Sequence, residues 1–105
     1  PARKVWIAFA VGAVGTVMVD DGARAALLSG GSSLLPAGVV STSGGFDADD
    51  AVEVVDRSGV PFAKGISRIP AEILDSVVGR RSAELPADVS PAAIHRDDLV
   101  VLPEG

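Results

Sequence analysis

The stretch that decides the fold is Gly30-Gly31-Ser32-Ser33-Leu34-Leu35-Pro36-Ala37-Gly38-Val39-Val40-Ser41. It follows residues 20–28, whose apolar side chains recur at helical spacing, and it begins with a glycine pair. Such a pair ends a helix, because glycine takes the left-handed conformation without penalty. Pro36-Ala37-Gly38 predicts a tight turn in which we expect Gly38 to have a positive φ, and Val39-Val40 predicts the start of a strand. The expected order is therefore helix, glycine stop, turn and strand.

The flanking residues extend this pattern into a mixed, β-rich chain. Asp20 is expected to cap a first helix near Ala23–Leu28, and apolar spacing predicts a second helix near Ala71–Val78. Asp56-Arg57-Ser58-Gly59 is typical of a hairpin turn, and residues 41–45 are expected to form a loop. Strands are expected where β-branched and aromatic residues cluster, at residues 16–19, 39–40, 52–55, 62–66 and 99–102.

Short strands joined by hairpin turns favour a partly closed barrel over a parallel sheet. The expected fold class is therefore a mixed, β-rich pseudo-barrel with two flanking helices, and 105 residues make a single domain, residues 1–105. The period-two strands and the helical runs predict a core that contains Trp6, Val17, Leu27, Leu35, Val39, Val54, Ile66, Leu74 and Val100.

The first residues leave two interpretations open. Arg3-Lys4 followed by the apolar run Val5–Val11 imitates a signal peptide, and the same run is explained by a buried strand, which we expect. The run is far shorter than the roughly 20 residues that cross a membrane, so no membrane partner is expected. Because the chain starts with Pro1 rather than Met, we also expect it to have been cut or processed.

Composition restricts the chemistry that the chain can perform. With 48% hydrophobic residues it can build a core, and without cysteine it has neither disulfides nor thiolate metal ligands, which fits a cytoplasmic protein. The formal net charge is −5, so binding to a phosphate backbone would need a local basic patch.

Three segments imitate catalytic or ligand-binding motifs and fail on detail. His95-Arg96-Asp97-Asp98-Leu99 imitates a protein-kinase catalytic loop, but Leu102 stands where that loop needs Asn; we expect His95 to cap or pack at the entry to the last strand. Residues 47–58 lack the glycine and glutamate of a calcium loop, so a solvated turn is expected there. Gly30-Gly31-Ser32-Ser33 follows a helix, whereas phosphates prefer the N-terminal end. No catalytic, cofactor-binding or metal-binding residue is assigned.

Six blocks along the chain carry a family resemblance: Arg3–Ile7, Val19–Ala23, Gly31–Val39, Phe46 followed by Val52, Ala63–Arg68 and His95–Val100. They resemble the PUA domain, a small mixed barrel common in RNA-modifying enzymes, and specifically the C-terminal PUA domain of glutamate 5-kinases. The most specific of the six is the last block, His95–Val100. The resemblance covers nearly the whole chain, and residues 1–14 look like the junction with an upstream kinase domain.

Three departures stand against this resemblance. Phe9 occupies a position where the family usually has glycine, and Asp49 replaces the usual glycine of the Phe-x-x-Gly-Asp turn. Residues 85–88 form a different linker. The first two change the local freedom of the backbone, and none removes a core position.

The resemblance implies two functions of different classes. In the first, the chain is a non-catalytic accessory domain of a cytoplasmic enzyme that phosphorylates the side-chain carboxylate of glutamate with ATP and Mg²⁺ in proline biosynthesis. Its partners would be the upstream amino-acid-kinase domain, which would bind those cofactors, and further copies of the enzyme in a homo-oligomer.

The alternative is an RNA-binding module, with weak RNA binding expected because Arg24 is the only basic residue between Asp20 and Gly38. A further basic cluster would need the other basic side chains to meet in space. The candidate RNA or partner surface comprises Arg24, Ser32, Ser33, Leu34, Gly38, Lys64, Arg68, Arg80 and Arg81.

Overall fold

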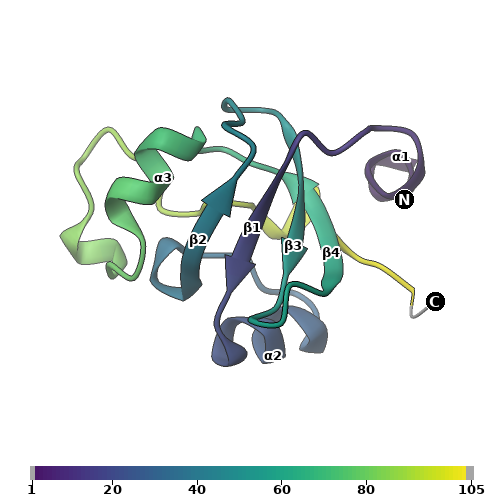
Figure 1. Ribbon diagram of the computed structural model, residues 1–105, viewed down its shortest axis with the longest axis horizontal. Coiled ribbons are helices and arrows are strands. Elements are labelled where there is room, and N and C mark those ends of the chain that lie inside the picture. Colours follow the sequence, from purple (N-terminus) through teal and green to yellow (C-terminus); the bar gives the residue numbers. More distant parts are fainter. Residues whose placement is uncertain (1, 104–105) are drawn as a thin grey trace.

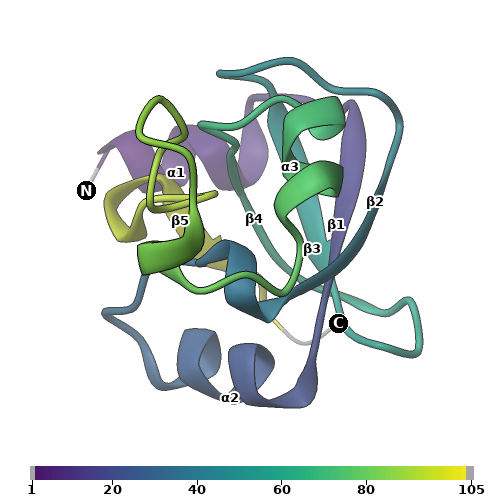
Figure 2. The same ribbon diagram turned by 90° about the vertical axis from the view of Figure 1, so that its left-hand side faces the viewer.

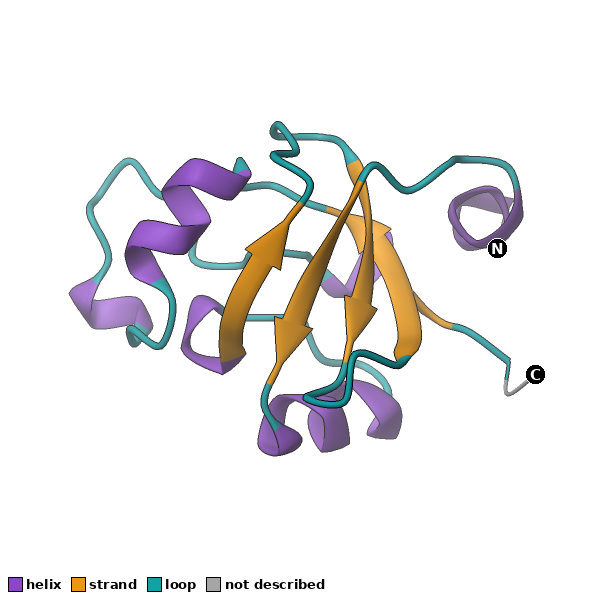
Figure 3. Ribbon diagram, in the orientation of Figure 1, coloured by secondary structure: helices purple, strands orange, loops and turns teal. Residues whose placement is uncertain are grey.

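A computed structural model describes residues 2–103. Pro1, on which the expectation of a processed start rests, lies outside the described residues. The strands are β1 (Gly15–Val19), β2 (Val39–Ser43), β3 (Ala51–Val55), β4 (Pro61–Ile66) and β5 (Leu99–Val101). The helices are α1 (Ala2–Phe9), α2 (Asp21–Ser29) and α3 (Ala71–Val77), with short 3-10 turns η1 (Pro36–Gly38), η2 (Ser82–Glu84) and η3 (Arg96–Asp98). The mixed, β-rich class with two flanking helices is confirmed, and α1 is an additional helix (Figure 3).

The strands form one five-stranded sheet in the order β2-β1-β3-β4-β5. Only β1 and β3 run parallel; the other neighbours are antiparallel. The sheet stays open between its edge strands β2 and β5, but the segments that lead into them meet in an antiparallel bridge between Leu34 and Ile94. This bridge gives the fold its partly closed character.

The hairpin turn between β3 and β4 forms where the sequence predicts it. One carboxylate oxygen of Asp56 accepts hydrogen bonds from the amides of Ser58 and Val60, at 2.9 and 3.0 Å. Gly59 has a φ of 81°, which explains the glycine at this position. In the loop before β3, Asp49 has a φ of 71°, a conformation that favours glycine. Aspartate is one of the few residues other than glycine that adopt this conformation.

Three helices surround the sheet at different places (Figures 1 and 2). α2 lies across one end of the strands, α3 packs beside β2, and α1 lies beyond β4 and β5 at the other side of the molecule. The main core fills the space between the sheet, α2 and α3. A second, smaller cluster joins Ile7 of α1 to Ala51 and Ile66 on the other face of the sheet.

Most of the predicted core is confirmed. Val17, Leu27, Val39, Val54, Ile66 and Leu74 are buried, and Val100 is half-buried against the α1 cluster. Two predictions are wrong: Trp6 is 49% exposed and Leu35 is 44% exposed. The backbone before η1 is extended and places consecutive side chains on opposite sides, so Leu34 is buried and its neighbour Leu35 faces outward.

The N-terminal run is a helix, and the predicted strand at Val5–Ala10 is therefore wrong. An apolar run of this length suits either element, because periodicity alone does not distinguish a short buried strand from a short helix. The predicted loop at residues 41–45 is also too long, since β2 continues to Ser43 by pairing with β1. None of the helices within residues 2–103 combines the length and apolar character needed to cross a membrane.

Candidate functional site

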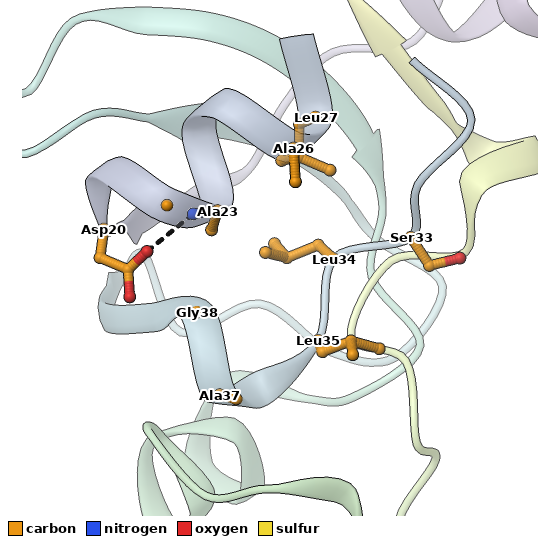
Figure 4. Close-up of a pocket in the computed structure, with 10 residues that line it drawn as sticks. Asp20, Ala23, Ala26, Leu27, Ser33, Leu34, Leu35, Ala37 and Gly38 are labelled. Carbon is orange, nitrogen blue, oxygen red and sulfur yellow. Dashed lines mark hydrogen bonds between the residues drawn. The ribbon is translucent and has the colours of Figure 1, made fainter. Parts of the chain in front are cut away.

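An apolar pocket of about 320 Å³ lies between α2 and the turn η1 (Figure 4). Leu34 reaches into the space between the helix and the turn, toward Ala23 and Gly38, while the hydroxyl of Ser33 points away. The pocket is lined by Asp20, Gly22, Ala23, Ala26, Leu27, Ser33, Leu34, Leu35, Ala37 and Gly38. Three candidate surface residues, Ser33, Leu34 and Gly38, therefore meet here.

Local sequence chemistry builds both walls of this pocket. Asp20 caps α2 by accepting a hydrogen bond from the amide of Ala23 at 2.8 Å, which satisfies one of the free amides at the start of the helix. The amide of Asp20 donates to the carbonyl of Gly38 at 3.0 Å and so ties the start of α2 to the end of η1. The φ of Gly38 is not positive, contrary to our expectation. Its lack of a side chain matters because a Cβ there would lie 2.6 Å from the Cβ of Ala23.

The loop from α2 to η1 is anchored at its far end. Leu34 donates its amide to the carbonyl of Ile94 and accepts from the amide of Ala93, both at 2.8 Å. The hydroxyl oxygen of Ser33 accepts from the amide of Arg96 at 2.8 Å, and Ser32 is half-buried. Leu34 is 1% exposed, so it shapes the floor of the pocket rather than a flat outer surface.

Arg24 directs its charge away from this pocket. Its Nε lies 3.8 Å from a carboxylate oxygen of Asp56, and its guanidinium sits 5.6 Å from the centre of the Phe62 ring. Both partners belong to the β3–β4 hairpin and its turn. Within residues 2–103, the only charged side chain that lines the pocket is the carboxylate of Asp20. An apolar pocket with an acidic edge is poorly suited to a phosphate backbone.

The other basic residues of the candidate RNA or partner surface lie in different parts of the molecule. Lys64 lies on the α1 side of the sheet, where its ammonium group donates to the carbonyl of Val11. Arg80 and Arg81 are exposed after α3, which lies at the other side of the molecule (Figure 2). Arg68 is exposed beside Asp88 and Ser90. The structure thus does not bring Lys64 together with Arg80 and Arg81.

The segments that imitate catalytic motifs have structural roles. The Nδ1 of His95 accepts a hydrogen bond from the amide of Asp97 at 3.1 Å, so His95 caps η3 at the entry to β5, as expected. Asp50 accepts from the amide of Asp47 at 2.8 Å and closes the predicted turn. Among residues 2–103 there is no group of three His, Asp or Glu side chains placed to hold a metal ion.

Sequence reasoning missed two features of this surface. Gly22 and Ala26 lie one helical turn apart on α2, and their small side chains leave the room that the pocket occupies. Two small residues four positions apart were the sequence signal that could have predicted this pocket. The outward face of α1 was missed altogether because the segment was interpreted as a buried strand.

Comparison with known proteins places this architecture in a family. A sequence profile of the PUA domain matches residues 15–88, which contain the pocket, both flanking helices and the first four strands. The chain belongs to the PUA domain family. Among solved structures, a PUA domain from Aeropyrum pernix K1, crystallised as a tartrate complex, is similar with a TM-score of 0.65 and 27% identity, covering 79% of this chain and 41% of that one.

This PUA domain is also similar to part of several curated enzymes. The glutamate 5-kinase of Syntrophotalea carbinolica is 42% identical over 95% of this chain. That of Myxococcus xanthus is 44% identical over 96%. The chain spans about 28% of the length of these relatives and matches their C-terminal region.

Proposed function

We propose that this PUA domain is the C-terminal accessory domain of a glutamate 5-kinase and carries out no chemical step itself. The observation that carries the proposal is the identity of 42–44% with such enzymes along nearly the whole chain. The last block, His95–Val100, supports it further, because general PUA domains of RNA enzymes do not usually carry that block. ATP, Mg²⁺ and glutamate would bind in the preceding amino-acid-kinase domain.

The accessory role would concern assembly or regulation of the whole enzyme. The residues that line the apolar pocket beside α2 include no set of metal ligands, and the hydroxyl of Ser33 points away from it. Its chemistry therefore suits contact with a protein or small-molecule partner rather than catalysis. We propose that the whole protein is a homo-oligomeric enzyme of the cytoplasm, the compartment in which amino acids are synthesised.

We expect glutamate-dependent ATP turnover from the intact protein and none from residues 1–105 alone. The reason is that the domain holds no phosphate-binding loop and no nucleophile motif. A coupled assay for ADP, with and without glutamate, measures both preparations. Turnover by the purified domain would contradict the proposal, and so would an intact protein that turns over ATP only with another acceptor.

RNA binding is the second function considered, and we expect it to be weak. Nonspecific RNA affinity comes mainly from counterion release by clustered Lys and Arg side chains. Here Arg24 faces Asp56. Lys64 contacts Val11 just after α1, whereas Arg80 and Arg81 follow α3, which lies at the other side of the molecule from α1. Fluorescence anisotropy with mixed cellular RNA should give a Kd no tighter than about 10⁻⁴ M at physiological salt. Micromolar binding that weakens with salt and is lost in Arg80→Ala/Arg81→Ala would favour the RNA function.

A further inference from the structure

Helix α1 has one face that is fixed to the domain. Ile7 is fully buried against Ala51 and Ile66 on the sheet. At the start of the helix, Nε of Arg3 donates to a carboxylate oxygen of Asp98 at 2.6 Å, a hydrogen bond that raises the pKa of Arg3. At its end, the carbonyl of Val11 accepts from Lys64. The position of α1 is therefore set by the domain itself.

The other face of α1 is apolar as well, and it is exposed. Val5 is 58% exposed, Trp6 49% and Phe9 76%, and neighbouring Val101 of β5 is 39% exposed. We call these four residues the α1 patch. Val5 and Trp6 lie four and three positions before Phe9, so the three side chains share one side of the helix. The patch continues into a hollow of about 290 Å³ between α1 and β5.

A helix that carries large apolar side chains on two sides, here buried Ile7 and exposed Trp6 and Phe9, is typical of one that is covered on both sides. Aromatic residues are also enriched at the centres of protein interfaces, where they bury a large area at low entropic cost. The exposed aromatic residues Trp6 and Phe9 therefore indicate a contact that residues 2–103 do not supply.

The size of the patch favours a partner that is tethered rather than free. A stable interface between separate proteins buries about 800 Å² on each side, which four side chains do not provide. A domain linked through the chain reaches an effective concentration in the millimolar range, at which a small contact is occupied. The chain corresponds to about 28% of the relatives' length, at their C-terminal end, and α1 precedes the residues 15–88 that match the PUA profile.

We propose that the α1 patch docks onto the domain that precedes this PUA domain in the same polypeptide. The inference rests on the proposed function, which supplies an amino-acid-kinase domain as the occupant. The hollow between α1 and β5 receives a side chain of that domain, and α1 becomes a helix packed between the two domains. Helix α1 lies at the other side of the molecule from α3 (Figure 1), so docking through α1 leaves the α3 surface free.

Thiol labelling of single-cysteine variants tests this docking. The chain contains no cysteine, so the Val5→Cys thiol is the only one in residues 1–105, and cysteine is close to valine in size. In the intact protein this thiol should react at least about tenfold more slowly than in residues 1–105 alone, as read by mass spectrometry of its peptide. Ile73→Cys, on the 43% exposed Ile73 of α3, is the matched control and should react equally in both.

A second substitution separates docking from other causes of protection. In the intact protein, Phe9→Ser added to Val5→Cys should restore the labelling rate of the isolated domain, whereas Ile73→Ser should not. Equal rates for Val5→Cys in the intact protein and the isolated domain would overturn the proposal. Protection that appears in the isolated domain as its concentration rises would assign the patch to a second copy and overturn it too.

Glutamate-dependent ATP turnover, measured on the same preparations, keeps the two proposals distinguishable. An active enzyme with an unprotected Val5→Cys thiol overturns the docking alone. A protected thiol in a protein without this turnover supports the docking and overturns the proposed enzyme function alone.

Discussion

Gly38→Val is expected to destabilise the domain by about 1–3 kcal/mol, the usual cost of forcing extra atoms into a packed region. A Cβ at Gly38 would lie 2.6 Å from the Cβ of Ala23, and valine adds two further methyl groups. The hydrogen bond between the amide of Asp20 and the carbonyl of Gly38 prevents η1 from simply moving away. Urea denaturation followed by circular dichroism measures the change in the free energy of unfolding.

Two further variants test that cause. Gly12→Val is the matched control, because a Cβ at Gly12 meets no atom within 4 Å and its stability should change by less than about 0.5 kcal/mol. Ala23→Gly removes the opposing methyl group and should recover part of the loss in Gly38→Ala, as a double-mutant cycle would show. A Gly38→Val domain as stable as the parent would mean that α2 and η1 do not pack this closely.

Ile94→Ala should cost about 2–5 kcal/mol, the range for deleting a large side chain from a buried site. Ile94 is fully buried, its carbonyl accepts the amide of Leu34 at 2.8 Å, and its side chain lies over Gly65 of β4. The side chain therefore packs where the Leu34–Ile94 bridge holds the two ends of the open sheet together.

The same denaturation assay measures this loss, with Val60→Ala as the control. Val60 is 55% exposed, so removing its methyl groups should change stability by less than about 0.5 kcal/mol. A cost below about 1 kcal/mol for Ile94→Ala would show that the bridge region is not part of the main core.

The parts of the fold that could be predicted from the sequence depend on local chemistry. Asp20 caps α2 and Asp56 closes the β3–β4 turn because a carboxylate near free amides acts within a few residues. The helix predicted near Ala71–Val78 also forms, since its apolar side chains repeat at a spacing that only a helix places on one face.

The parts that could not be predicted depend on contacts between distant residues. The parallel pairing of β1 with β3, and the bridge from Leu34 to Ile94, leave no local signal. The run Val5–Phe9 suits a strand as well as a helix, and only its packing against the sheet decides between them. The sequence suggested a positive φ at Gly38, which is wrong. The close approach of Ala23 to Gly38 is visible only once α2 and η1 are placed together.

The candidate surface is likewise divided into residues whose proximity follows from the sequence and residues whose positions depend on the fold. Ser33, Leu34 and Gly38 are neighbours around one pocket because the chain between α2 and β2 is short. The basic residues are far apart in the sequence and have no such constraint, so the sequence could not tell that Lys64 contacts Val11 after α1 while Arg80 and Arg81 follow α3. Their separation is the main physical reason for expecting weak RNA binding.

The most direct test of the central claim is to delete this domain from the intact protein and compare kcat and molecular mass with the parent. If the domain is an accessory part of a glutamate 5-kinase, kcat for glutamate phosphorylation should stay within about threefold, because no residue of the chemical step is removed. The oligomer measured by light scattering, or the response to proline, should change. Loss of the chemical step in a truncated protein that remains folded, or an unchanged oligomer together with an unchanged response to proline, would contradict the account.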